Sequence, residues 1–242
     1  MIDFHTHILP GIDDGSRDIP MTEAMLRAEA AQGVELVVAT PHFYANQMSI
    51  DRFLTRRERA LEATEDMRRR AKAALPALMV GAEVYYFQGM GMAEAIEKLC
   101  VGDTRTILVE MPFEQWTEGV LKDVEQLIRK RKLNVVLAHV ERYTGFQRNR
   151  DIWNRVMELP LTPQINAGSF IGKGGFLRPD RTRKFCLSFL EGHPRLIIGS
   201  DCHNMEGRVP NIARARDEIQ RAMGPEALEE IDATVKEALS IS

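Results

Sequence analysis

The first seven residues of the chain, MIDFHTH (1–7), combine a short apolar run with two histidines. The run Met1–Phe4 is typical of a buried strand, and His5 and His7 follow it directly. Side chains two residues apart on an extended backbone point to the same side, so both imidazoles can reach one cation. This stretch predicts a strand that ends at a metal site, provided that ligands from elsewhere in the chain join it.

Six further apolar runs recur along the chain, separated by longer amphipathic stretches. The additional strands are expected at Leu36–Thr40, Leu78–Val84, Thr106–Glu110, Val135–Ala138, Pro163–Asn166 and Leu196–Ser200. Helices are expected at Met21–Gln32, Ser49–Ala74, Met92–Leu99, Glu118–Lys132, Arg150–Glu158, Arg181–Leu190, Ile212–Met223 and Pro225–Leu239. This alternation predicts a parallel sheet, because parallel neighbours are joined by crossover helices. An open doubly wound sheet and a closed barrel both fit, but no glycine-rich dinucleotide loop opens the first helix, which weighs against the open sheet.

No linker, repeat or break in composition divides the chain, so residues 1–242 are expected to form one domain. Two helix starts have capping signals: Asp18 lies shortly before Pro20, and Ser49 precedes the long charged helix. The basic stretch 56–72 of that helix has interleaved acidic residues at helical spacing, which favours a solvated face over a binding patch.

Each expected strand runs into a potential metal ligand or an amide at or just past its carboxyl end. In chain order these residues are His5 and His7, His42, Glu83, Glu110, His139, Asn166, and Asp201 with His203. In a parallel barrel the carboxyl ends of the strands converge on one rim, where such folds hold their functional residues. Imidazoles and carboxylates without thiolates suit manganese, iron or zinc. Each residue alone is compatible with a structural role, but their joint occurrence at the strand ends predicts a metal centre.

Charge at this rim indicates more than one ion. The carboxylates of Asp14, Glu83, Glu110 and Asp201 would repel one another and raise one another's pKa if no cation lay between them. Two divalent ions would neutralise these four charges, and three would leave about two positive charges, which suits an anionic substrate.

Composition excludes several classes of protein. With 44% hydrophobic residues, the 242-residue chain can bury a full core, and it is not a disordered or collagen-like sequence. A net charge of −3, from 32 basic and 35 acidic residues, argues against a nucleic-acid partner. Three cysteines form no disulfide framework and favour the reducing cytoplasm. No signal peptide or membrane-spanning run is visible, so membrane insertion is not expected.

Seven blocks of the sequence carry a specific resemblance. They are DFHTHILPGIDDGS (3–16), TPHFY (40–44), GAEVYY (81–86), LVEMP (108–112), LAHVERY (137–143), INAGSF (165–170) and GSDCHN (199–204). The sequence resembles the polymerase-and-histidinol-phosphatase (PHP) superfamily. Within it, the order and wording of the blocks are similar to the bacterial protein-tyrosine phosphatases linked to capsule and exopolysaccharide synthesis. The similarity spans about residues 1–212.

The resemblance implies an α/β fold of PHP type, a distorted (β/α)7 TIM-like barrel. It also implies a cluster of three divalent ions, commonly manganese, with iron, zinc or magnesium as alternatives. Carried over position by position, one ion would be held by His5, His7, Glu83 and Asp201, a second by Glu83, Glu110 and His139, and the third by Asp14, His42 and His203. Arg142 and Arg208 match arginines that grip the phosphate, and Asp14 or His42 would protonate the leaving group.

The activity implied by the resemblance is metal-dependent hydrolysis of phosphotyrosine in a protein. The implied partner is the tail of a bacterial tyrosine autokinase of the capsule or exopolysaccharide system. A small-molecule phosphomonoesterase, such as a histidinol-phosphate phosphatase, is the alternative from the same superfamily. A metal-binding scaffold without turnover is a further alternative, disfavoured because no expected ligand is missing.

Two features allow other interpretations. Cys202 and Arg208 have the Cys-x5-Arg spacing of thiol-dependent tyrosine phosphatases, but so short a motif arises readily by chance in an arginine-rich chain. The aromatic residues beside the expected ligands either frame an aromatic substrate or pack under the rim; they are Phe43, Tyr44, Tyr85 and Tyr86.

Overall fold

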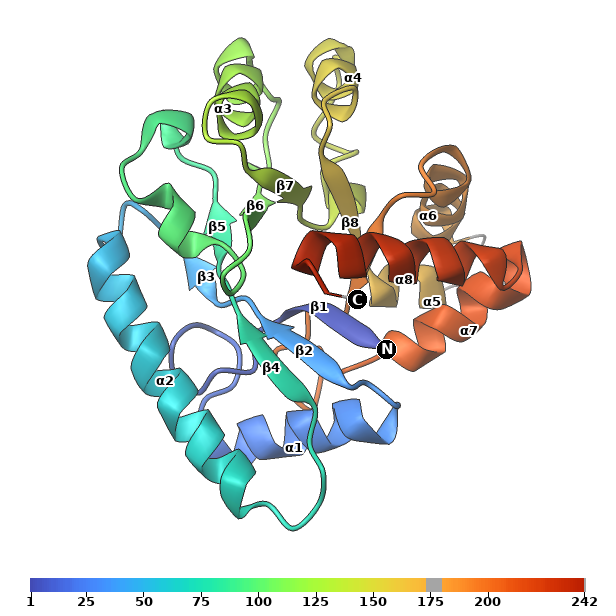
Figure 1. Cartoon of the computed structure of the whole chain (residues 1–242). Helices are drawn as coiled ribbons and strands as arrows, with labels where there is room; N and C mark the ends of the chain where they lie inside the picture. The colour runs from blue at the N-terminus through green and yellow to red at the C-terminus, as the bar shows by residue number, and fades with distance from the viewer. Residues whose placement is uncertain (173–179, 242) are drawn as a thin grey trace.

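Parallel strands form a strongly curled sheet at the centre of the molecule (Figure 1). The computed structural model describes residues 1–172 and 180–241. Its strands are β1 (Ile2–Thr6), β2 (Leu36–Ala39), β3 (His42–Phe43), β4 (Ala77–Val80), β5 (Glu83–Tyr85), β6 (Thr106–Glu110), β7 (Asn134–Leu137), β8 (Thr162–Asn166) and β9 (Ile197–Gly199). They pair in the orders β1-β2-β4 and β3-β5-β6-β7-β8-β9, and each of these pairs is parallel.

The last strand returns to the first and closes the ring. Thr6 forms a parallel bridge with Cys202, just beyond β9. The backbone N–H of Asp201 donates to the carbonyl of His5 (2.8 Å), and the N–H of His7 donates to the carbonyl of Cys202 (2.9 Å). Because β2 continues into β3 and β4 into β5, the described strands occupy seven positions around the ring. The predicted (β/α)7 barrel is confirmed.

Two neighbouring strands bend together, and this bend distorts the barrel. Pro41, which has no N–H to donate, separates β2 from β3, and Gly81 with Ala82 separates β4 from β5. Hydrogen bonds still cross the bend, because the N–H of Gly81 donates to Ala39 (2.9 Å) and that of Glu83 to Pro41 (3.0 Å). The predicted unbroken strand Leu78–Val84 is therefore wrong. A Cβ at position 81 would lie 2.8 Å from Val101 Cγ2, a close approach that periodicity does not show.

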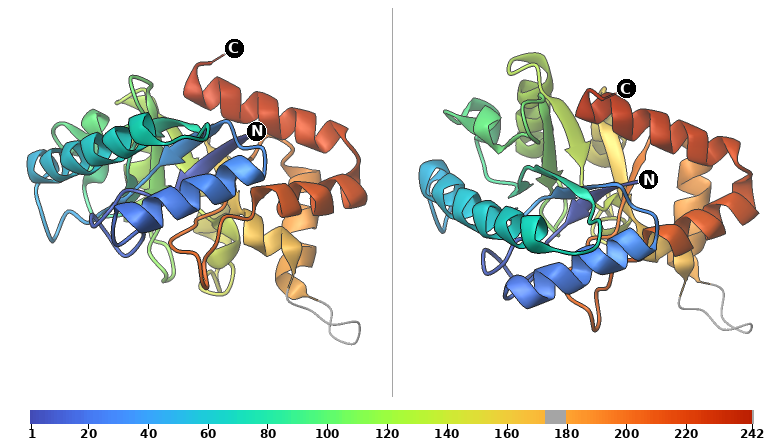
Figure 2. Two further views of the ribbon diagram at one scale, coloured as in Figure 1. Left: turned by 90° about the horizontal axis from the view of Figure 1, so that it is seen from below. Right: turned by 60° about the horizontal axis from the view of Figure 1, so that its bottom comes forward.

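Helices cover the outside of the strand ring. They are α1 (Ile19–Ala31), α2 (Ile50–Arg70), α3 (Glu118–Arg129), α4 (Asp151–Met157), α5 (Ala167–Ile171), α6 (Arg181–Gly192), α7 (Ile212–Met223) and α8 (Glu226–Leu239). Figure 2 shows α1 and α2 side by side on one flank. Both expected caps are confirmed: Asp18 accepts a hydrogen bond from the N–H of Met21, and Ser49 from that of Arg52.

Helix α2 buries one face and leaves most of its charged residues to solvent, apart from the buried Arg57, which donates to the carbonyl of Gly81 (2.9 Å). Its buried residues recur every three or four positions, at Phe53, Arg57, Ala60, Thr64 and Met67. The expected solvated face is therefore present. Within the described residues, no helix has both the length and the apolar character needed to cross a membrane.

Two short segments differ from the secondary structure predicted from the sequence. Met92–Leu99 was expected to be one helix, but the structure has two 3-10 turns, η1 (Met90–Met92) and η2 (Ile96–Leu99). Tertiary packing overrides helical spacing here, because η1 packs against α3 and a Cβ at Gly91 would lie 2.7 Å from the carbonyl oxygen of Asp123. The short helix α5, directly after β8, was not expected.

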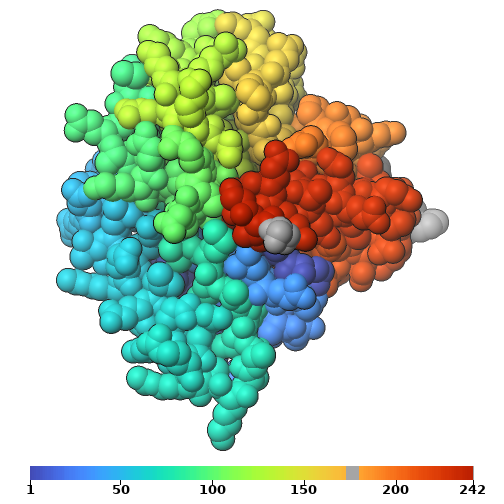
Figure 3. Space-filling model, viewed as in Figure 1, coloured from blue at the N-terminus to red at the C-terminus, as the bar shows by residue number. Residues whose placement is uncertain are grey.

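Helix α8 covers the end of the barrel opposite to the predicted metal site. Several strands each contribute one inward residue to the barrel interior, namely Phe4, Val38, Leu108, Val136 and Ile197. These residues pack with Val235 and Leu239 of α8. Thr106, at the start of β6, donates its hydroxyl to the carbonyl of Ala238 (2.5 Å). In Figure 3 the carboxyl-terminal segment accordingly lies against amino-terminal and central segments of the chain. Because α8 covers this end, the carboxyl ends of the strands lie at the end of the barrel that α8 does not cover.

Substitution of Gly199 by alanine tests the closure of the barrel. A Cβ at this position of β9 would lie 2.5 Å from His5 Cβ and 2.9 Å from His5 N, so β1 and β9 must separate. We expect Gly199→Ala to lower the free energy of unfolding by about 1–3 kcal/mol, measured by urea denaturation. The control is Gly192→Ala at the end of α6, where nothing lies within 4 Å of the added methyl group. Equal stability of the two variants would contradict this account.

Candidate metal centre

The side chains predicted as metal ligands gather at the carboxyl end of the strand ring. They are His5, His7, Asp14, His42, Glu83, Glu110, His139, Asp201 and His203. Most are fully buried, whereas the side chain of Asp14, on the loop after β1, is 67% exposed. Parallel strands bring together residues almost 200 positions apart, because all of them end at the same rim.

Glu83 lies at the centre of this group and contacts four imidazoles. Its Oε2 is 3.2 Å from His5 Nε2, 3.2 Å from His7 Nε2 and 3.0 Å from His42 Nδ1. Its Oε1 is 2.9 Å from His139 Nε2. One carboxylate thus lies among ring nitrogens of four histidines, an arrangement that could hold a divalent cation.

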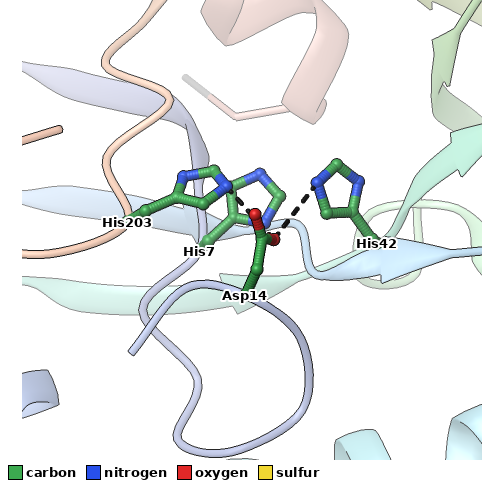
Figure 4. A group of neighbouring side chains, drawn as sticks. All are labelled: His7, Asp14, His42 and His203. Carbon is green, nitrogen blue, oxygen red and sulfur yellow. Dashed lines mark ion pairs between the residues drawn. The ribbon is translucent and has the colours of Figure 1, made fainter. Parts of the chain in front are cut away.

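The ligand atoms form three overlapping groups. Within each, the atoms lie within 4.8 Å of one another: His5, His7, Glu83 and Asp201; His7, Asp14, His42 and His203; and His42, Glu83 and Glu110. His139 extends the third group through Glu83 and through Glu110, 3.5 Å away. Figure 4 shows the second group, in which the Asp14 carboxylate points at His42 (3.5 Å) and His203 (3.4 Å).

An irregularity in β1 directs His5 into the barrel. Asp3 pairs with Val37 and Thr6 with Ala39, so β1 has one residue more than β2 across this interval. Consequently Asp3 accepts hydrogen bonds from Ser200 N on the outside, while His5, two residues on, reaches Gln164 and Glu83. Without the extra residue, Asp3 and His5 would point to the same side.

Several buried polar atoms in the centre have no hydrogen-bond partner among the described residues. They are His42 Nδ1, Glu83 Oε2, His139 Nδ1 and His203 Nε2. A buried polar group without a partner is costly, so such groups need an explanation. His139 and Asp201 also adopt left-handed backbone conformations, with φ of 31° and 53°, which are uncommon for residues other than glycine. His42 Nδ1 and Glu83 Oε2, which face each other at 3.0 Å, fit the coordination of a divalent cation.

Electrostatics in the centre favour positive charge. Burial alone would lower the pKa of His139, but hydrogen bonds with Glu110 and Glu83 outweigh it and raise that pKa to about 9. Burial alone would raise the pKa of Glu83, but the charge of His5 and the close contacts with the His139 and His42 rings hold it well below its usual value. The carboxylates therefore favour the protonated form of His139, and divalent cations would likewise balance their negative charge.

Three supporting residues were not assigned a role from the sequence. Asp13 Oδ2 is 2.7 Å from His7 Nδ1 and also accepts the N–H of His42 (3.0 Å). Gln164 Oε1 accepts the N–H of His139 (2.8 Å) and lies 3.1 Å from His5 Nδ1. Asn166, expected at its strand end but not assigned a role, donates to Asp201 Oδ2 (2.8 Å).

These contacts hold the Nδ1 atoms of His5 and His7, so the Nε2 atoms are free to face the centre. Metal-binding histidines are commonly oriented in this way by a carboxylate or carbonyl group. Asp13 and Asp14 are adjacent and of the same residue type, so the sequence does not show which of them orients a ligand. Asp13 alone has this orienting role because the loop turns it back towards His7, where its Oδ1 also accepts the N–H of Gly15 (3.0 Å).

The two predicted phosphate-binding arginines flank Asp201 at the rim. Arg208 Nη2 lies 2.6 Å and Arg142 Nη1 3.7 Å from Asp201 Oδ2, and both side chains are more than 40% exposed. Arg142 packs over the Phe113 ring, 5.0 Å from its centroid. Asn204 organises the loop that presents Arg208, because its Oδ1 accepts three backbone N–H groups between positions 206 and 208.

Cys202 is placed away from the centre. Its side chain is fully buried, with Sγ 3.8 Å from Glu29 Oε1 of α1, while its neighbours Asp201 and His203 face the ligand group. Burial and the charges of Glu29 and Asp3 raise the pKa of the thiol well above its usual value. A reactive cysteine needs access and a lowered pKa, so the Cys-x5-Arg match is a coincidence of spacing.

A seven-position parallel barrel with imidazoles and carboxylates gathered at its strand ends defines a protein of the PHP type, as the sequence resemblance predicts. Residues 1–239 match the model of the family described as "Capsular polysaccharide synthesis, CpsB/CapC", and the chain belongs to this family. The predicted family is thereby confirmed.

Relatives and solved structures agree with this membership. The chain is 29% identical over 236 residues to the tyrosine-protein phosphatase YwqE of Bacillus subtilis, covering 93% of this chain and 86% of YwqE. It is 27% identical over 248 residues to the tyrosine-protein phosphatase CpsB of Streptococcus pneumoniae, covering 96% and 94%. A crystal structure from a study of these two proteins, described as unique metal-dependent tyrosine phosphatases, has the same fold. Its TM-score is 0.78 at 24% identity, and the match covers all of this chain and 96% of the solved one.

Replacement of Asp13 tests whether it orients His7. We expect Asp13→Ala to weaken metal binding by about 10–100-fold, because His7 loses the partner that fixes its ring and tautomer. Metal titration by calorimetry measures the effect. The control Asp18→Ala removes the cap of α1 and costs about 1 kcal/mol of stability, but it should leave metal affinity unchanged. Equal metal affinity of the Asp13 variant and the parent would refute the orienting role.

Proposed function

We propose that this chain is a metal-dependent protein-tyrosine phosphatase, a phosphoric monoester hydrolase of capsule or exopolysaccharide synthesis. The observation that carries the proposal is the buried Glu83 carboxylate contacted by four imidazoles beneath two rim arginines. The relatives support the substrate, because YwqE and CpsB are both named tyrosine-protein phosphatases and the family is described as acting in capsular polysaccharide synthesis.

In this proposal the centre holds three divalent ions, with manganese the first candidate. His5, His7, Glu83 and Asp201 hold one ion, Glu83, Glu110 and His139 a second, and Asp14, His42 and His203 the third. The three groups of mutually close ligand atoms support this division. The group with Asp14, His42 and His203 also contains His7, and the group with Glu83 and Glu110 also contains His42. Such ions supply Lewis acidity and lower the pKa of water in the site towards neutrality.

The residues of the chain have distinct roles in the proposed hydrolysis. Arg142 and Arg208 hold the non-bridging phosphate oxygens through charge-assisted hydrogen bonds, which spread the charge that develops on them. Both guanidiniums stand within 4 Å of Asp201, so they are already at the mouth of the centre. Asp14 or His42 delivers the proton to the leaving phenolate, and their contact at 3.5 Å allows either one to act.

The proposed substrate is the phosphotyrosine-bearing tail of a bacterial tyrosine autokinase in the cytoplasm. Three cysteines with free, buried thiols support a reducing compartment. A small-molecule phosphomonoesterase, such as a histidinol-phosphate phosphatase, is the alternative. Faster turnover of histidinol phosphate than of a phosphotyrosine peptide by the manganese-loaded protein would favour that alternative.

Removal of the central carboxylate tests the metal dependence. We expect Glu83→Gln to lose bound metal and at least about 100-fold in kcat/KM on a phosphotyrosine peptide, because an anion shared between ligand groups becomes neutral. Elemental analysis of the purified protein accompanies the assay. The matched control is Glu118→Gln, which removes only a surface pairing with Arg155. A Glu83 variant with full activity and metal content would rule out the proposed centre.

Replacement of Cys202 separates the metal-dependent mechanism from the thiol-dependent one. We expect Cys202→Ser to keep phosphatase activity within about threefold of the parent, because the thiol faces Glu29 and not the centre. Chelator treatment should abolish activity in both proteins, and added manganese should restore it. Loss of activity in the serine variant at unchanged metal content and stability would instead point to a phosphocysteine mechanism.

A further inference from the structure

Two hollows adjoin the metal centre on different sides of the rim. One, of about 530 Å³, has polar walls that include Asn166, Ser169 and Arg208. The other, of about 420 Å³, lies beside β3 and β5 and is lined by the aromatic residues Tyr44, Tyr85, Tyr86 and Phe87 together with residues 45–47. Both volumes fall in the range of small-ligand sites, about 300–1,000 Å³. Their chemistry differs, and only the second offers aromatic ring faces.

Strand register places Tyr44 and Tyr85 one layer above the ligands. His42 pairs with Glu83 across β3 and β5; two residues further along, Tyr85 ends β5 and Tyr44 lies directly after β3. Residues two apart share a face, so the tyrosine rings continue the ligand face towards the rim. The Tyr44 ring lies 5.2 Å from the His42 ring and 5.6 Å from the Tyr85 ring, measured between centroids.

The other two aromatic residues singled out in the sequence have structural partners, although Tyr86 also lines the hollow. Phe43 is buried and packs against Phe53, and the hydroxyl of Tyr86 donates to Asp123 of α3 (3.0 Å). Tyr44 and Tyr85 are half-buried, and among the described residues no hydrogen bond joins their hydroxyl groups. Tyr44 and Tyr85 are therefore the pair whose rings contact each other, and the Tyr44 ring also lies next to the His42 ring.

The arginines determine which way a leaving group points. Arg142 follows β7 and Arg208 follows β9, whereas Tyr44 and Tyr85 belong to the β3 and β5 positions across the ring of strands. A phosphate whose non-bridging oxygens contact the arginines directs its ester oxygen away from them, towards the tyrosines. A ring attached to that oxygen would meet aromatic faces at the spacing that aromatic pairs prefer, about 4.5–7 Å.

We propose that Tyr44 and Tyr85 form an aryl subsite that binds the phenyl ring of the substrate's phosphotyrosine and selects aryl over alkyl phosphate esters. This inference rests on the proposed phosphatase function and specifies how the same site recognises its leaving group. The rings provide the contact and the hydroxyl groups do not, since the interaction is one of ring faces.

The first test compares two peptides of one sequence that carry phosphotyrosine or phosphoserine. We expect Tyr44→Leu and Tyr85→Leu each to lower kcat/KM for the phosphotyrosine peptide by about 3–10-fold, and kcat/KM for the phosphoserine peptide by less than about twofold. Tyr44→Phe, which keeps the ring, should retain the selectivity of the parent. Tyr86→Phe is the control, because it removes only the hydrogen bond to Asp123. Equal losses on both peptides, or none on either, would overturn the aryl subsite.

A second test does not depend on turnover. Calorimetry on the manganese-loaded protein compares phenylphosphonate with methylphosphonate, which have the same acidic group. We expect the parent to bind phenylphosphonate more tightly and Tyr44→Leu to reduce that preference by about 3–10-fold. Equal binding of the two phosphonates by the parent would refute the subsite. Failure to hydrolyse any phosphate ester would refute the proposed function, while the phosphonate preference would still decide the subsite.

Discussion

The contact of one buried carboxylate with four imidazoles is the constraint on which the rest of this structure depends. Glu83 meets His5, His7, His42 and His139 within 3.2 Å, in an interior where unpaired charge is costly. The arrangement is possible because every strand of the ring ends at the same rim, and it demands positive charge between the ligand atoms. Four polar atoms of the centre have no hydrogen-bond partner among the described residues, which also favours a bound cation.

Hydrogen bonds behind the ligands hold them ready for this charge. Asp13 orients His7, Gln164 lies against His5 and the backbone of His139, and Asn166 donates to Asp201. The bends at Pro41 and Gly81 place His42 and Glu83 side by side, directly after the two interruptions. Rigid support of this kind keeps the ligands in position, so little reorganisation is needed when cations bind.

Above the centre, the rim divides into regions of different chemistry. Guanidinium groups gather next to Asp201 after β7 and β9, and tyrosine rings stand across from them at β3 and β5. A phosphate ester of an aromatic alcohol has the same two parts, an anion and a ring, joined through one oxygen. The arginine region after β7 and β9 thus suits the phosphate of the proposed substrate, and the tyrosine region at β3 and β5 suits its ring.

The sequence by itself determined the alternation of strands and helices, the parallel sheet and the ligand types at the strand ends, whereas closure into a barrel was implied by the family resemblance. These are local properties: apolar periodicity sets each element, and strand direction then brings His5, Glu83 and Asp201 to one rim. Only the tertiary structure decided which of the adjacent acids Asp13 and Asp14 orients a ligand, that Leu78–Val84 breaks at Gly81, and that Cys202 faces Glu29. Such choices depend on close contacts between segments far apart in the chain, and two neighbouring residues of one type carry no local signal that separates them.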